Sequence, residues 1–181
     1  TAMKIMLPRA GMWLSPNGEY FTSEEIRRFY PSAVPDRYWE VPAHSVIHTH
    51  NQAMDILRRG TELPTDPRDK YKPEYVKMME SIKYSATPSE NFDNFIISFH
   101  AKYNTLSISP QHAVLVFASC LGGMAAETYD HWLRMLHAQA PQVNITRLPL
   151  NHVIAALAQM YWTTQVQQQH VQTLKDSLMQ D

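Results

Sequence analysis

The segment from Thr87 to Met135 constrains the fold most strongly, because it reads as three consecutive helices separated by a turn and a glycine pair. Its second helix, expected over residues 109–121, is apolar on every side. A helix of this kind must be buried from two directions, whereas an amphipathic helix needs only one buried face. The segment therefore predicts a helical core and, in addition, a second burial of the middle helix, which another copy of the same chain could supply.

The three helices carry distinct start and stop signals. Thr87 and Glu90 have the spacing of a capping box, with Pro88 at the first helical position, and Ser109 followed by Pro110 repeats a start signal. Gly122 is expected to end the second helix in the left-handed conformation, and a third helix is expected over about residues 124–137. The apolar positions of the first helix fall on one face and are Phe92, Phe95, Ile96, Phe99 and Tyr103.

Composition favours an all-α protein. The 181 residues are 44% hydrophobic and 18% charged, which is enough to build a core, and the 12 prolines cluster where helices would begin. The formal net charge of −1 supplies no basic face for a phosphate backbone, so strong binding of DNA or RNA by this sequence alone is not expected.

The sequence divides into two small helical lobes at the short polar stretch 85–88. The N-terminal lobe, 1–84, is expected to hold a helix capped by Thr22 and Glu25 that runs to Tyr30, a helix over about 42–59, a polar loop over 60–72 and a helix from Pro73 to about Tyr84. The C-terminal lobe, 87–172, is expected to hold four helices, the last of which turns Gln-rich, and 173–181 is expected to fray. No strand is expected.

The single cysteine, Cys120, excludes an internal disulfide framework and fits a reducing compartment. Its apolar neighbours indicate a small buried hydrophobe rather than a reactive thiol. The sequence contains neither an apolar run near 18 residues nor a signal-peptide pattern, so we expect no membrane association and a cytoplasmic location.

Histidines are the first candidates for chemistry. His44 and His48 lie four residues apart and could offer two nitrogens to one metal, with His50 nearby, but Ser45 stands where a zinc protease carries its glutamate and no third ligand follows. Packing or surface roles are therefore favoured. The sequence also lacks a nucleophile elbow and a phosphate-binding loop. We expect no enzyme activity, no metal site and no cofactor.

The helix over 110–121 supplies the candidate interaction site. One stripe would pack on the aromatic row of the preceding helix and comprises Ala113, Val114, Phe117, Ala118 and Leu121. The opposite side holds Leu115 and Val116, bracketed by His112 and Ser119. Two explanations are open for this second side: the long last helix covers it within the same lobe, or it forms a self-complementary patch at a two-fold axis.

The sequence resembles the Gag capsid domain of copia-type LTR retrotransposons (Pseudoviridae). The residues that carry the resemblance are Phe92, Phe95, Phe99, Tyr103, Leu106-Ser107-Ile108-Ser109, Ala113, Leu115, Leu121-Gly122-Gly123, Tyr129, Asn144-Ile145-Thr146 and Met160-Tyr161. Upstream residues spaced as in yeast members are Asn17-Gly18, Thr22, Glu25, Tyr30, Pro35 and Trp39. The resemblance covers most of the chain.

The resemblance implies a two-lobed capsid protein that self-assembles into virus-like particle shells around RNA and has no catalytic residue. Neither a Cys/His zinc knuckle nor a basic tail follows, so contact with RNA is expected only through regions outside this sequence. Little room precedes Ser15 for the early helices of an N-terminal lobe, which could be truncated or borrowed from a partner. A domesticated gene or a fragment that interferes with assembly fits equally. The rival expectation is a monomeric helical adaptor that binds a partner helix or peptide.

Overall fold

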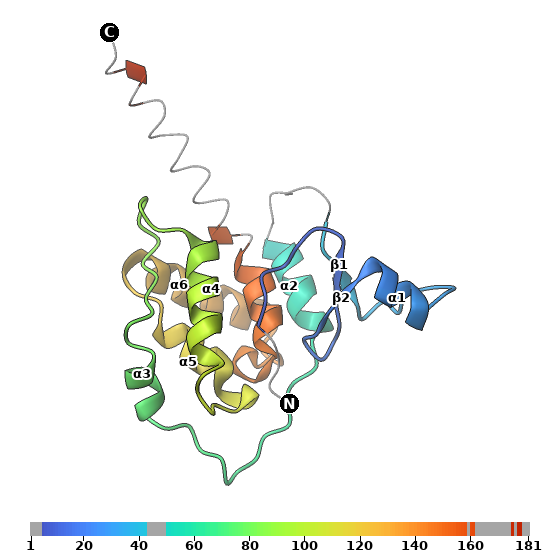
Figure 1. Ribbon diagram of the computed structural model, residues 1–181, viewed down its shortest axis with the longest axis horizontal. Coiled ribbons are helices and arrows are strands. Elements are labelled where there is room, and N and C mark those ends of the chain that lie inside the picture. Colours follow the sequence, from blue (N-terminus) through green and yellow to red (C-terminus); the bar gives the residue numbers. More distant parts are fainter. Residues whose placement is uncertain (1–4, 43–49, 159, 162–174, 176, 179–181) are drawn as a thin grey trace.

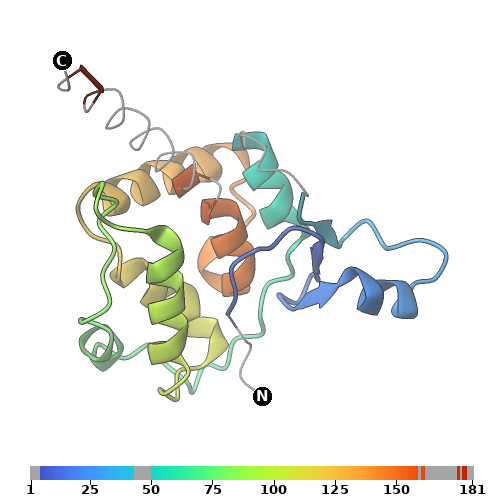
Figure 2. The same ribbon diagram turned by 45° about the horizontal axis from the view of Figure 1, so that its top comes forward.

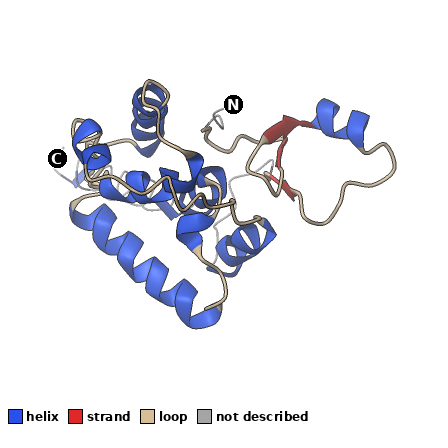
Figure 3. Ribbon diagram, turned by 90° about the horizontal axis from the view of Figure 1, so that it is seen from below, coloured by secondary structure: helices blue, strands red, loops and turns tan. Residues whose placement is uncertain are grey.

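A computed structural model describes residues 5–42, 50–158, 160–161, 175 and 177–178. Most of the described chain is helical, as the sequence predicts, but a small three-stranded antiparallel sheet is also present (Figure 1). The expectation of a purely all-α fold is therefore wrong in this respect. The strands gather at one end of the molecule, and helices make up the rest (Figure 3).

The sheet is built from three short strands in the order β2-β1-β3. Strand β1 is Met12–Leu14, β2 is Tyr20–Thr22 and β3 is Trp39–Glu40. The turn between β1 and β2 needs a left-handed residue, which Gly18 provides at φ 90°. One face of the sheet closes a small apolar cluster made of Leu14, Trp39, Val41, Ile56 and Ala155.

Helix α1, Ser23–Phe29, follows the sheet and begins at the predicted capping box. The Thr22 hydroxyl accepts a hydrogen bond from the Glu25 amide at 3.2 Å, and the Glu25 carboxylate accepts one from the Thr22 amide at 3.4 Å. Together with the sheet, α1 projects from the helical body at one end of its long axis (Figures 1 and 2).

Helix α2, His50–Arg59, and helix α3, Glu74–Met78, are joined by the predicted polar loop. The first part of the helix expected over 42–59, residues 43–49, lies outside the described residues. Helix α3 is shorter than expected, since it does not reach Tyr84. Tyr84 instead forms a parallel bridge with Leu121: its amide donates to the Cys120 carbonyl at 3.0 Å, and its carbonyl accepts from the Gly122 amide at 2.9 Å.

Helix α4, Phe92–Tyr103, carries the predicted aromatic row, and all five apolar positions are buried. Its N-cap is Asn91 rather than Thr87. Thr87 and Glu90 still bond to each other as in a capping box, with 2.7 Å between hydroxyl and carboxylate, but they order the loop that precedes the helix.

The predicted second helix is split into a 3-10 turn, η1 (Pro110–His112), and a short helix, α5 (Ala113–Ser119). Helix α6, Gly123–Gln139, follows. Its N-cap is Gly122, whose backbone is extended at φ −129°. The left-handed glycine is Gly123, at φ 48°, which is the first residue of α6. Helix α5 is capped by Cys120 in the right-handed conformation, so the left-handed cap expected at Gly122 is not formed. A second 3-10 turn, η2 (Ile145–Arg147), precedes the helical segment 150–158.

The largest apolar cluster draws residues from both sides of the stretch 85–88. Met54, Leu57 and Met79 belong to the same buried cluster as Phe92 and Phe117. The structure therefore places one continuous core across the expected lobe boundary. The predicted core positions Phe92, Phe95, Phe99, Tyr103, Phe117, Leu121 and Tyr129 are all buried in it.

Candidate self-association surface

Helix α5 packs its aromatic residue directly onto the row of α4. The Phe117 ring lies 5.6 Å from that of Phe95 and 5.4 Å from that of Phe99, measured between centroids. The second contact is edge-on, at 80°, an arrangement that aromatic pairs favour. Four residues of the stripe that the sequence assigns to the core are buried, and the fifth, Ala118, is partly buried against it.

The opposite side of α5 is also covered, by other segments of the same chain. Both α3 and η2 contact α5, and Val116 has none of its surface exposed. Cys120, directly after α5, is likewise fully buried. Segments of the same chain therefore bury the second side of this apolar helix, and no second copy is needed for it. The inference that α5 leaves excess apolar surface is wrong except at Leu115, which is 38% exposed.

The four candidate contact residues therefore separate into different environments. Val116 and His112 are buried and cannot meet another molecule in this fold. Ser119 is half-buried, and its hydroxyl donates a hydrogen bond of 2.6 Å to the Val116 carbonyl. Leu115 alone presents an apolar side chain to solvent.

A polar cluster around Asp69 holds the loop before α3 against the start of α5. The Ser109 hydroxyl donates to the Asp69 carboxylate, and the His112 Nε2 lies 3.5 Å from an oxygen of the same carboxylate. The hydrogen bond from Ser109 lowers the pKa of the Asp69 carboxyl below its usual value. Gln111 adds a hydrogen bond of 2.9 Å to the Asp69 carbonyl. This cluster explains why His112 is buried. The sequence gives no signal for the pairing of His112 with Asp69, because the two residues are far apart along the chain.

Next to this cluster, exposed apolar side chains border two shallow depressions. The first, of about 340 Å³, is lined by Leu115 and Tyr71 with Arg147 at its edge. The second, of about 680 Å³, lies between Tyr71, Met78 and Ile108. Tyr71 is common to both, and Met78 is 45% exposed. We call the set Tyr71, Met78 and Leu115 the Tyr71 surface.

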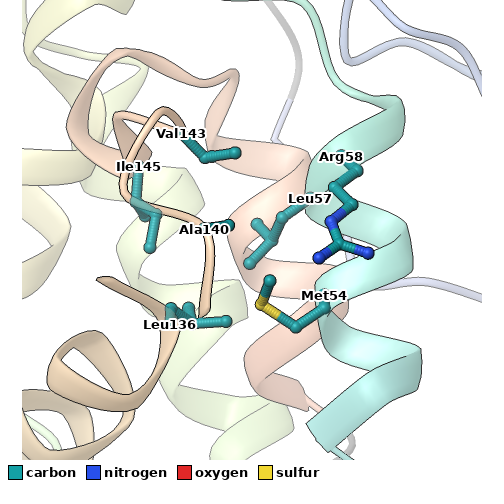
Figure 4. A pocket seen from close by; sticks show the side chains of 7 residues that line it. All are labelled: Met54, Leu57, Arg58, Leu136, Ala140, Val143 and Ile145. Carbon is teal, nitrogen blue, oxygen red and sulfur yellow. The ribbon is translucent and has the colours of Figure 1, made fainter. Parts of the chain in front are cut away.

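An enclosed pocket lies between α2 and the end of α6 (Figure 4). Its volume is about 10 Å³, and the side chains that line it are apolar except for Arg58. A cavity of this size has room for about one water molecule, and its apolar lining offers few hydrogen bonds. It is a small packing defect and has no room for a ligand.

The residues that the sequence suggests for metal binding or catalysis do not form a site in the described part of the chain. His44 and His48 lie outside the described residues, and His50 is the first residue of α2. Among the described residues, no group of three histidine, cysteine or acidic side chains is placed to hold a metal. Burial raises the pKa of the Cys120 thiol to about 11, which fits the predicted inert hydrophobe.

His152 is a buried group that the sequence does not single out. It is fully buried, and neither ring nitrogen has a hydrogen-bond partner among the residues that the structure describes. The ring packs against Gly60, where an added Cβ would lie 3.1 Å from it. Burial lowers the pKa of His152 to about 4. The imidazole is therefore neutral near pH 7 and acts as a packing group.

A scan of protein-family models, a search of curated proteins and a search of solved structures each find no match to this chain. Membership of the copia-type Gag family thus stays a prediction that rests on the motifs of the sequence. Within the part of the chain that the structure describes, the helices are too short or too polar to cross a membrane.

Proposed function

We propose that this protein is a structural, non-enzymatic subunit that self-associates, as a Gag-like capsid protein or as a truncated or domesticated relative that modulates shell assembly. The Tyr71 surface carries the proposal. Single exposed hydrophobics are ordinary on soluble proteins, but here three of them border two adjoining depressions. The resemblance to copia-type Gag proteins supports a second copy of the chain as the molecule that covers them.

The setting of this surface suits a repeated contact. The Asp69 cluster fixes the loop that carries Tyr71, and Leu115 stands on a helix whose other residues are mostly buried. Both side chains are therefore presented on ordered backbone, which reduces the entropy lost on binding. Each contact is small, and a shell needs only weak contacts because multivalency multiplies them.

The proposal is tested by sedimentation velocity from low micromolar to near-millimolar protein. We expect the average mass to rise with concentration, and Leu115→Glu and Met78→Glu to weaken this rise because each places a charge on the Tyr71 surface. Ile97→Glu is the matched control, since Ile97 is 57% exposed on α4 and lies outside that surface. A wild-type chain that stays monomeric at every concentration would refute self-association.

The adaptor remains the second candidate, favoured by the larger depression beside α3. An extended or helical peptide could occupy a groove of about 680 Å³ that has Met78 at its edge, because methionine adapts to different partners. Such a protein would stay monomeric until its peptide is added. The same sedimentation experiment therefore separates the two candidates.

A further inference from the structure

Helix α6 has an outward face with an unusual arrangement of apolar residues. It is the longest of the labelled helices and lies along one edge of the helical body (Figure 2). Its inward face is buried through Ala125, Tyr129, Trp132 and Leu136. On the outside, Met124 is 56% exposed and Met135 is 40% exposed. Within the described part of the chain, two large apolar side chains of the same helix are thus substantially exposed.

The two methionines belong to one stripe. They are eleven residues apart, which in an α-helix is about three turns, so their directions differ by only ~20° and their Cα atoms lie ~16 Å apart along the axis. Thr128 and His131 fall between them on the same side, and neither is buried. The stripe therefore has an apolar group at each end and small or polar groups at its centre.

One flank of this stripe carries opposite charges at matching positions. Glu127 and Arg134 are seven residues apart and so share that flank, with the acid toward the start of the helix and the base toward its end. Both are solvent-exposed or nearly so. Within the described parts of the chain, neither of them enters an ion pair. Their charges are available to an outside molecule.

We infer that α6 docks against α6 of a second copy, antiparallel, about a two-fold axis near Asp130. In this arrangement Met124 of each copy meets Met135 of the other, since the axis lies midway between them. The same axis brings Glu127 of each copy to Arg134 of the other. Every contact therefore occurs twice, as a two-fold interface requires. This inference rests on the proposed function and specifies one of its interfaces.

The charge pattern selects a second copy, and it also selects the antiparallel orientation. A two-fold axis that reverses helix direction brings like flanks together, so the acid of one copy faces the base of the other. A parallel pair would bring the charged flank against the opposite one, where Gln139 carries no charge. A foreign helix would need a base opposite Glu127 and an acid opposite Arg134. A second copy in antiparallel orientation supplies both.

The expected contact is weak. One pair of short helices buries less area than a standard stable interface, and the ion pairs lie at its rim where solvent screens them. A weak two-fold contact is nevertheless sufficient if the Tyr71 surface makes a second, independent contact. Two different interfaces on one subunit allow an assembly to extend beyond a dimer.

Charge exchange tests the inference directly. Glu127→Arg and Arg134→Glu each create two repulsive pairs in the antiparallel dimer, and we expect each to raise its Kd about tenfold. An equal mixture of the two variants should associate as well as wild type, because every facing pair in the mixed dimer is again acid against base. The double variant Glu127→Arg with Arg134→Glu should also recover. Circular dichroism of each variant checks that its fold is intact.

The outcomes separate this inference from the proposed function. Recovery in the mixture supports the antiparallel α6 contact, because a structural defect in either variant would persist on mixing. Variants that associate as tightly as wild type would refute the α6 contact while leaving self-association through the Tyr71 surface in place. A wild-type chain that is monomeric throughout would refute both. Loss of association that mixing does not restore would also overturn the antiparallel pairing.

Discussion

Truncation of two neighbouring residues on α5 to alanine should have different effects on stability and on self-association. Val116→Ala removes both γ-methyl groups of a side chain that has no exposed surface. At about 0.8 kcal/mol per buried carbon, the lost transfer free energy is about 1.6 kcal/mol. The cavity left behind brings the expected loss to about 2 to 3 kcal/mol. Leu115→Ala should cost less than about 1 kcal/mol, because that side chain is 38% exposed.

Urea unfolding of both variants at low protein concentration measures the difference. With a denaturant slope of about 2 kcal/mol/M, the midpoint for Val116→Ala should fall by about 1 M urea, and that for Leu115→Ala by far less. In sedimentation, only Leu115→Ala should weaken self-association. An unchanged unfolding midpoint for Val116→Ala, together with weaker self-association, would show that a second copy buries Val116 and would refute the enclosed position of α5.

Three further predictions concern buried polar groups. Because burial lowers the pKa of His152 from 6.5 to about 4, only the unfolded state binds this proton between those values. Stability should thus be complete above pH 6.5 and fall by up to ~1.4 kcal/mol per unit toward pH 4, and urea unfolding of His152→Leu across this range should show a smaller slope. The Cys120 thiol should react with an aromatic disulfide only after unfolding, so a stoichiometric reaction with the native chain within seconds would contradict its burial. Asn151→Ala should lower the unfolding free energy by about 2 to 4 kcal/mol, since it leaves the Met6 amide and the Gly18 carbonyl without the hydrogen bonds they make to Asn151; a loss below 1 kcal/mol in urea would contradict this.

The sequence predicts those elements whose signals are local. The capping box of Thr22 and Glu25 starts α1 as expected, and the aromatic spacing from Phe92 to Tyr103 marks α4 correctly. Both signals depend on contacts within one helical turn or along one helix face, so they need no knowledge of the rest of the chain. The predicted core positions follow for the same reason.

The remaining features depend on contacts between distant segments. Strands β1, β2 and β3 are two or three residues long, too short for an alternating pattern to be seen. The start of the second helix at a 3-10 turn changes the angular position of the residues that follow, because such a turn advances about 120° per residue rather than 100°. This difference rotates His112 relative to α5 but leaves Val116 and Phe117 in the same relative positions. Val116 is buried because α3 and η2 both contact α5. The cover that α3 and η2 give to α5 has no sequence signal at all.

The hydrogen bonds of Asn151 have a consequence during synthesis of the chain. Its side-chain oxygen accepts from the Met6 amide at 2.9 Å, and its nitrogen donates to the Gly18 carbonyl at 2.6 Å, so the first described segment is anchored 145 and 133 residues downstream. These bonds cannot form until Asn151 has left the ribosome. At translation rates of about 5 to 20 residues per second, the sheet end waits roughly seven to thirty seconds for its anchor. Until then the Met6 amide and the Gly18 carbonyl must find water or another molecule as partner, because the groups that Asn151 supplies are not yet present.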